Sequence, residues 1–214
     1  MHITFDHFFV KIQEIQQLDL HPEASHVKME PLDRVEFMKN LKPEDFDPKN
    51  AAVMVLIYPK NKTAHLVLIL RTSYNGVHSS QVAFPGGKAE TFDIDFWATA
   101  LRETEEEIGV ITHDVEHIKD LTPIYVPPSN FMVYPFLGCS KKSLTFCPDP
   151  KEVAGIIEIS VHDFLHNTSV VSKNLSTSYM LDKEVNGFEI ENHFVWGATA
   201  MMLSELKDLL IKVL

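Results

Sequence analysis

A run of charged residues near the middle of the sequence is the part best suited to chemistry. It reads Arg102-Glu103-Thr104-Glu105-Glu106-Glu107-Ile108-Gly109. In a helix that turns by about 100° per residue, Glu103, Glu106 and Glu107 fall on one face. Three carboxylates on one face repel one another unless a cation joins them, and an all-oxygen ligand set suits a hard ion such as Mg²⁺ or Mn²⁺. The pattern therefore indicates a divalent-metal site.

The residues around this run distinguish a metal site from a solvated acidic helix face, which is the alternative interpretation of the same glutamates. Arg102 precedes Glu106 by one turn, so it can pair with this carboxylate and hold its orientation as part of a catalytic set. The segment Phe84-Pro85-Gly86-Gly87 precedes the helix, and Gly109 ends it. This combination favours the metal site.

The stretch from Gly87 to Val110 resembles the box of the Nudix hydrolase family, G-x5-E-x7-R-E-U-x-E-E-x-G-U, where U is a bulky aliphatic residue. The second half matches from Arg102 onward, with Thr104 at the first aliphatic position. In the first half Asp93 replaces the glutamate, and one extra residue precedes Arg102. The resemblance implies an α/β fold, namely an α/β/α sandwich around a mixed sheet.

The departures in the first half are similar to the coenzyme A diphosphatase branch of that family. Its members read FPGGK-x-D-x-x-D-x-D-x3-TALRE-x2-EE-x-G. Here the corresponding residues are Phe84 to Lys88, then Glu90, Asp93 and Asp95, then Thr99 to Glu103. The resemblance extends more weakly from about residue 51 to the segment Trp196–Ala200, which also looks like that branch.

A second motif of the branch, upstream of the paired glycines, matches only in part. Arg71, His78 and Gln81 resemble residues of branch members and are the candidate substrate-binding residues. The arginine position of the motif is Gly76, and its glycine position is Ser80. The alternative that this segment is merely a loop connecting two strands therefore stays open. The alternative that the enzyme acts on another nucleotide, such as an ADP-sugar, a dinucleoside polyphosphate or NADH, stays open as well.

The resemblance also implies a mechanism. Water attacks the phosphorus of a nucleoside diphosphate linked to another moiety, and Mg²⁺ or Mn²⁺ neutralises the diphosphate and lowers the pKa of water. The implied metal ligands are Glu103, Glu106 and Glu107, with the carbonyl oxygen of Gly86 as a further one. Coenzyme A or an acyl derivative would give 3′,5′-ADP and a 4′-phosphopantetheine species.

The general base stays open between Glu106 and Glu152, which precedes an expected strand and is similar to a glutamate of the branch. A Nudix-fold binding module without turnover is the alternative to an enzyme, but it usually carries a degraded box, and this box keeps its carboxylates. The segment His113–His117 fits the H-x-x-E-H zinc-peptidase motif. That motif requires a helix, whereas here it follows the helix-ending Gly109.

Hydrophobic patterning predicts the elements that position these residues. Helices are expected over 3–17, 32–41, 95–108 and 198–213, and strands over 51–58, 64–70, 118–126, 131–138, 153–159, 178–185 and 188–195. A hairpin turn is expected at 59–62 and a break at 85–87. Within the helix over 95–108, the residues expected to face the core are Trp97, Leu101, Thr104 and Ile108. We expect a helical extension over 1–50, packed on a Nudix domain over 51–214.

The composition is that of an ordinary soluble chain of 214 residues, 45% hydrophobic and 23% charged. A net charge of −11 makes nucleic acid and anionic membranes poor partners, so the expected partner is a small coenzyme A-like nucleotide. Two cysteines give no disulfide framework. We expect a cytoplasmic protein, since neither a signal-peptide pattern nor an apolar run of about 18 residues is evident. A homodimer is a reasonable expectation, because it is the commonest assembly.

Overall fold

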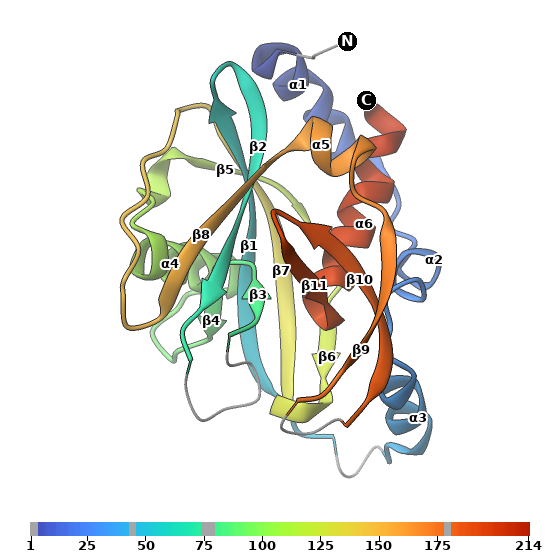
Figure 1. Ribbon diagram of the computed structural model, residues 1–214. Helices are drawn as coiled ribbons and strands as arrows, with labels where there is room; N and C mark the ends of the chain where they lie inside the picture. Colours follow the sequence, from blue (N-terminus) through green and yellow to red (C-terminus); the bar gives the residue numbers. More distant parts are fainter. Residues whose placement is uncertain (1–3, 43–45, 74–79, 178–180) are drawn as a thin grey trace.

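The computed structural model describes residues 4–42, 46–73, 80–177 and 181–214, and its centre is an eight-stranded mixed sheet (Figure 1). Strands β1 and β7 run parallel, and the other neighbouring strands of this sheet run antiparallel. The strands are β1 (Lys49–Lys60), β2 (Thr63–Arg71), β3 (Val82–Ala83), β4 (Gly86–Lys88), β5 (Val115–Asp120), β6 (Ile124–Val126), β7 (Phe131–Ser140) and β8 (Val153–Ser160).

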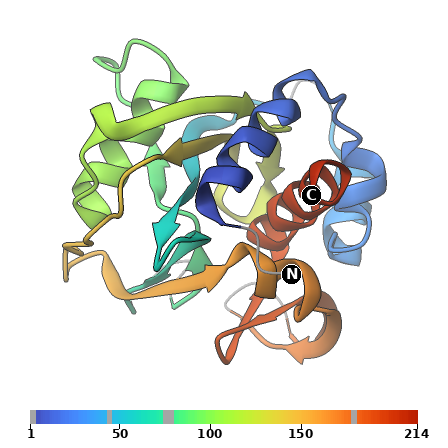
Figure 2. The ribbon, with the colours of Figure 1, turned by 90° about the horizontal axis from the view of Figure 1, so that it is seen from above.

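Helices cover both faces of the sheet. Helix α4 (Phe96–Ile108) lies on one face and α6 (Gly197–Val213) on the other, as the view from above shows (Figure 2). The apolar runs of the central strands are continuous because both faces are covered: residues 54–58 and 66–69 are all buried. The expected α/β/α sandwich with a mixed sheet is confirmed.

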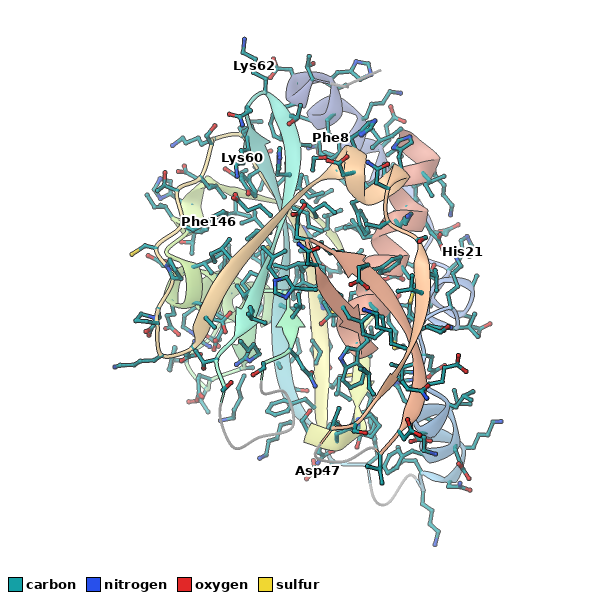
Figure 3. The ribbon with its side chains drawn as sticks, viewed as in Figure 1. Phe8, His21, Asp47, Lys60, Lys62 and Phe146 are labelled. Atoms are coloured by element: carbon teal, nitrogen blue, oxygen red, sulfur yellow. The ribbon has the colours of Figure 1, made fainter. Side chains whose placement is uncertain are left out.

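The N-terminal segment contributes helices to the α6 side. They are α1 (Phe5–Ile12), the 3-10 turn η1 (Gln13–Gln17), α2 (Pro22–His26) and α3 (Leu32–Asn40). Phe8, labelled in Figure 3, is buried in the same hydrophobic cluster as Leu206 of α6. The helix expected over 3–17 therefore exists but tightens into a 3-10 turn after residue 12. Helix α3 differs from the others because none of its side chains is fully buried.

A second, three-stranded sheet follows the main one. It is preceded by α5 (Val161–His166) and consists of β9 (Val170–Leu175), β10 (Lys183–Ile190) and β11 (His193–Trp196). The strand boundaries expected at 178–185 and 188–195 are wrong, because the chain reverses at Glu191 and Asn192, which have φ values of 47° and 66°. Residues 178–180 lie outside the described part of the chain. Strand β9 and helix α5 were not expected from the sequence.

Two further boundaries differ from expectation. The strand expected over 118–126 is split into β5 and β6 around Pro123, which has no amide hydrogen for a sheet ladder. The break expected at 85–87 is instead the start of β4, where Gly86 pairs with Val53 of β1. The hairpin between β1 and β2 is confirmed, with its left-handed residues at Asn61 and Lys62. Among the helices of the described ranges, none is long and apolar enough to cross a membrane.

Candidate active site

Helix α4 carries the acidic run, and it ends at Gly109 as the sequence predicts, whereas the cap at its start was not predicted. Asp95 caps the start, where its Oδ1 accepts a hydrogen bond of 2.7 Å from the amide of Ala98. Gly109 ends the helix at a φ of 72°, a conformation that glycine adopts without strain. Thr104 and Ile108 are buried as expected. These features set which way each glutamate of the helix points.

Arg102 is the centre of a charged network at the middle of α4. Its Nε and Nη2 atoms each donate to the Asp93 carboxylate at 3.0 Å. Its Nη1 atom donates to Glu103 at 2.8 Å and to Glu106 at 3.0 Å. Asp93 also accepts a hydrogen bond of 2.8 Å from the Thr99 hydroxyl. The expected pairing of Arg102 with Glu106 is confirmed. Asp93 holds the Arg102 guanidinium in the position from which it contacts Glu106.

Glu103 lies directly against the paired glycines. A Cβ atom added to Gly87 would come within 2.3 Å of Glu103 Oε2, so a larger residue there would displace this carboxylate. Gly86 is more strictly constrained, because it has a φ of 150° and the backbone carbonyl oxygen of Ala52 lies 2.3 Å from the place of a Cβ atom. The glycine pair therefore brings the backbone of β4 into contact with the acidic face of α4.

Glu107 is the most buried of the three glutamates, with 1% of its surface exposed. Its Oε2 accepts a hydrogen bond of 2.8 Å from the amide of Gly86, and its Oε1 lies 3.4 Å from Nη1 of Arg71. By contrast, the side chain of Glu106 is 60% exposed. The three carboxylates expected on one face thus differ in exposure, from a buried one at the sheet to an open one at the surface.

The carboxylates of this site repel one another. The pKa of Glu107 is raised to about 7, and burial is the largest cause. The contacts with Gly86 and Arg71 act in the opposite direction, and the charges of Glu103 and Glu152 add to the rise. Burial also raises the pKa of Glu103, where Arg102 acts in the opposite direction and Glu106 and Glu152 add to the rise. Glu152, exposed at the start of β8, is therefore close enough to act on two helix carboxylates.

The donor set of these carboxylates fits a hard cation. All the donors are oxygens, and their mutual repulsion is what a divalent ion relieves. In the described part of the chain, however, no three His, Cys, Asp or Glu side chains are already gathered as a metal cage. Instead, Nη1 of Arg102 bridges Glu103 and Glu106. The Arg102 guanidinium thus compensates part of the negative charge of these two carboxylates.

A cavity of about 630 Å³ lies on the other side of the glycine pair from α4. Its polar end includes Arg71, Gln81, Gly86 and Gly87. The structure thus brings two of the three expected substrate-binding residues, Arg71 and Gln81, to one cavity, and Arg71 also contacts Glu107 of the acidic helix. His78 lies outside the described residues, so its part in the site stays a prediction.

From sequence alone, Asp93 has no role beyond marking a departure from the box. The signal that could have indicated its bidentate contact with Arg102 is the need for an acidic partner that fixes the orientation of that guanidinium. The zinc-peptidase motif has no helical context: His113 lies in the 3-10 turn η3 (Thr112–Asp114), and Glu116 and His117 lie in strand β5. The two histidines therefore do not share a helix face. This agrees with the expectation that the motif lacks the helix it requires.

Comparison with known proteins agrees with this architecture. The family model described as the NUDIX domain matches residues 48–177. The "Uncharacterized Nudix hydrolase NudL" of Yersinia enterocolitica is 34% identical over 164 residues, which cover 73% of this chain and 79% of that protein. The protein of the same name from Yersinia pestis is 33% identical over 165 residues, which cover 74% of this chain and 78% of that one.

Solved structures share the fold. A MutT/nudix family protein from Enterococcus faecalis has a TM-score of 0.52 at 15% identity, covering 84% of this chain and 69% of that one. A Nudix hydrolase from Nitrosomonas europaea has a TM-score of 0.50 at 16% identity, covering 78% and 72%. Because the family model spans more than half of the sequence and the NudL relatives exceed 30% identity, this chain belongs to the Nudix family and is a Nudix hydrolase, a pyrophosphohydrolase enzyme.

Proposed function

We propose that this enzyme hydrolyses the diphosphate of coenzyme A or of an acyl-coenzyme A, giving 3′,5′-ADP and a 4′-phosphopantetheine species. The observation that carries the proposal is the stretch from Phe84 to Val110, whose glycines, Asp93 and TALRE segment are similar to the coenzyme A diphosphatase branch. The contact of Asp93 with Arg102 supports it, because it gives a structural role to the residue at which this stretch departs from the general family box.

The proposed metal ligands are Glu103, Glu106 and Glu107, with the Gly86 carbonyl oxygen as a further one, and the proposed ion is Mg²⁺ or Mn²⁺. When bound, a divalent ion neutralises diphosphate charge and lowers the pKa of water. The support is chemical: the donors are all oxygens, the charge of Glu106 helps to raise the pKa of Glu103, and the charge of Glu103 helps to raise the pKa of Glu107.

The remaining roles follow from the positions of the chain's own side chains. Arg102 holds Glu106 in orientation from one side, as its shared hydrogen bonds suggest. Glu106 and Glu152 are the two carboxylates proposed to accept the proton of the attacking water, since both are exposed at the edge of the site. Arg71 and Gln81, at the polar end of the cavity, are proposed to bind the substrate beside the diphosphate.

The proposed division of the chain is a helical extension over 1–50 and a Nudix domain over 51–214. The match of the family model from residue 48 supports a boundary near this position. Phe8 and Ile12 of the extension are part of the main hydrophobic cluster. We therefore infer that the extension is packed on the domain as a fixed part of the fold.

The decisive experiment incubates the purified protein with coenzyme A and Mg²⁺ or Mn²⁺ and separates the products by chromatography. The proposal expects 3′,5′-ADP from the wild-type protein and a loss of turnover in Glu106→Gln, with the fold checked by circular dichroism. Unchanged turnover in Glu106→Gln would remove this residue from the site. Cleavage of ADP-ribose or another diphosphate, with coenzyme A left intact, would keep the family mechanism and overturn the substrate.

A further inference from the structure

Helix α3 of the N-terminal segment forms a wall of the cavity that begins at the glycine pair. Although none of its side chains is fully buried, Phe37 faces the cavity and is 44% exposed. The helix is held in place by its polar residues: Arg34 Nε donates to the Tyr125 carbonyl oxygen at 3.2 Å, and Asp33 pairs with Lys183 of β10 at 3.2 Å. An apolar side chain is thus presented to the cavity by a helix that is anchored on both sides.

Much of the rest of the cavity lining is apolar. Helix α6 contributes Met201 and Met202, and strand β7 contributes Val133. Methionine side chains adapt to the shape of what they contact, and such a surface suits a flexible chain. The rings of Phe37 and Tyr125 pack on each other, with centroids 6.4 Å apart and planes tilted by 36°, so they do not form a parallel slot for a nucleobase.

The same cavity also reaches the glycine pair. The residues that line it include Arg71 and Gly86, and both contact Glu107 of α4. Arg71 brings a positive charge to this lining, and its buried Nε atom has no hydrogen-bond partner within the described part of the chain. A ligand that carries both a diphosphate and an apolar arm matches this combination of groups.

We propose that α3 is a specificity element of the enzyme, and that Phe37 contacts the apolar arm of an acyl-coenzyme A whose diphosphate lies at the glycine pair. This inference rests on the proposed function and adds to it the part of the substrate that the cavity selects. The enzyme is then expected to prefer an acylated substrate over free coenzyme A, because burying additional CH₂ groups against Phe37 and the methionines is favourable.

The test compares octanoyl-coenzyme A with coenzyme A as substrates for the wild type, Phe37→Ala and Met38→Ala. Met38 is the matched control, since it is a half-exposed apolar residue of the same helix that is not among the cavity-lining residues of the described structure. We expect Phe37→Ala to lower kcat/KM for octanoyl-coenzyme A by about 5- to 20-fold, mainly through KM. Coenzyme A itself should change less than about twofold, and Met38→Ala should change neither substrate.

Three results would contradict the inference. Hydrolysis of both substrates with the same preference in all three proteins would overturn the role of α3 and leave the proposed function intact. An equal loss on both substrates in Phe37→Ala would also overturn it, because the preference for the acylated substrate would then not depend on Phe37. If the wild type cleaves neither substrate, the proposed function is overturned, and so is the inference that an acyl arm contacts Phe37.

Discussion

Two buried glutamates on opposite faces of the sheet show how differently the same side chain can be used. Glu107 of α4 and Glu205 of α6 are each 1% exposed. The two helices cover the two sides of one sheet (Figure 2). Burial makes a charged carboxylate costly unless hydrogen bonds and opposite charges compensate for it. The difference between the two residues therefore lies in their partners.

Glu205 is well paired. It accepts hydrogen bonds from the amide of Thr122 at 3.0 Å and from its hydroxyl at 2.6 Å, and His26 lies 3.8 Å away. Burial alone would raise the pKa of Glu205, but His26 and Thr122 outweigh it, so that the pKa lies below its usual value. This carboxylate joins the N-terminal segment, the sheet and α6.

Glu107 has weaker compensation. It accepts one backbone hydrogen bond, from Gly86, and its contact with Arg71 is 3.4 Å long. Two neighbouring carboxylates add to the effect of burial, and its pKa is raised to about 7. A buried carboxylate left with this balance gains from an added cation, whereas Glu205 does not. This contrast is what the proposed metal-binding role of Glu107 predicts, whereas the contacts of Glu205 serve the packing of α6.

The largest effect is expected from Glu107→Gln. The substitution keeps an acceptor for the Gly86 amide but removes the charge, so we expect turnover to fall by at least about 100-fold. The free energy of unfolding without divalent ions should change by less than about 1 kcal/mol, because the cost of burying the charge disappears as well. Steady-state kinetics and urea denaturation measure the two quantities. Turnover near the wild-type value would remove the contrast between the two glutamates.

A smaller effect on activity is expected from Asp93→Asn. Asp93 is a paired carboxylate on the catalytic side: the Arg102 guanidinium, with a contribution from the Glu90 amide and Thr99, holds the pKa of Asp93 well below its usual range. Loss of one charged acceptor loosens Arg102 and thereby Glu106, so we expect turnover to fall by about 10- to 100-fold.

The control for Asp93→Asn is Glu90→Gln, which changes a neighbouring, more exposed carboxylate that pairs with Lys88 over 3.3 Å. Activity of this variant should stay within about twofold of the wild type, because exposed ion pairs contribute little. Equal activities of the two variants would show that the orientation of Arg102 does not limit turnover.

Glu205→Gln should affect stability and leave turnover unchanged. The amide keeps one acceptor for Thr122 but loses the charge near His26, so we expect the free energy of unfolding at pH 7 to fall by about 1–3 kcal/mol. Urea denaturation measures this change. Glu189→Gln is the matched control, since Glu189 pairs with Lys173 at the surface and should change stability by less than about 0.5 kcal/mol.

The pH dependence sharpens this prediction. The folded state lowers the pKa of Glu205 below its unfolded value of about 4.3, so the stabilisation is fully present above that value and is lost as the pH falls through the folded pKa. The stability difference between wild type and Glu205→Gln should therefore shrink below about pH 4. A difference that stays constant down to pH 3 would contradict an ionic role.

Local pattern was informative where a residue's surroundings lie close in sequence. Helix α4 with its Asp95 cap and its Gly109 end, and the hairpin at Asn61, follow from short-range preferences that tertiary contacts did not override. The boundaries of β10 and β11 did not follow, because the reversal at Glu191 and Asn192 lacks the glycine that marks such turns most clearly. Helix α5 is only one and a half turns long and shows no readable period.

The sequence by itself determined the acidic helix, the glycine pair and the charge balance, because each depends on residue type and on spacing within about 25 positions. Only the tertiary structure decided that Glu107 is buried while Glu106 is open, since burial depends on which strand packs on each turn of α4. It also brought Phe37 and Met201, from segments more than 160 positions apart, to the lining of one cavity. Such contacts arise from packing that no local pattern encodes.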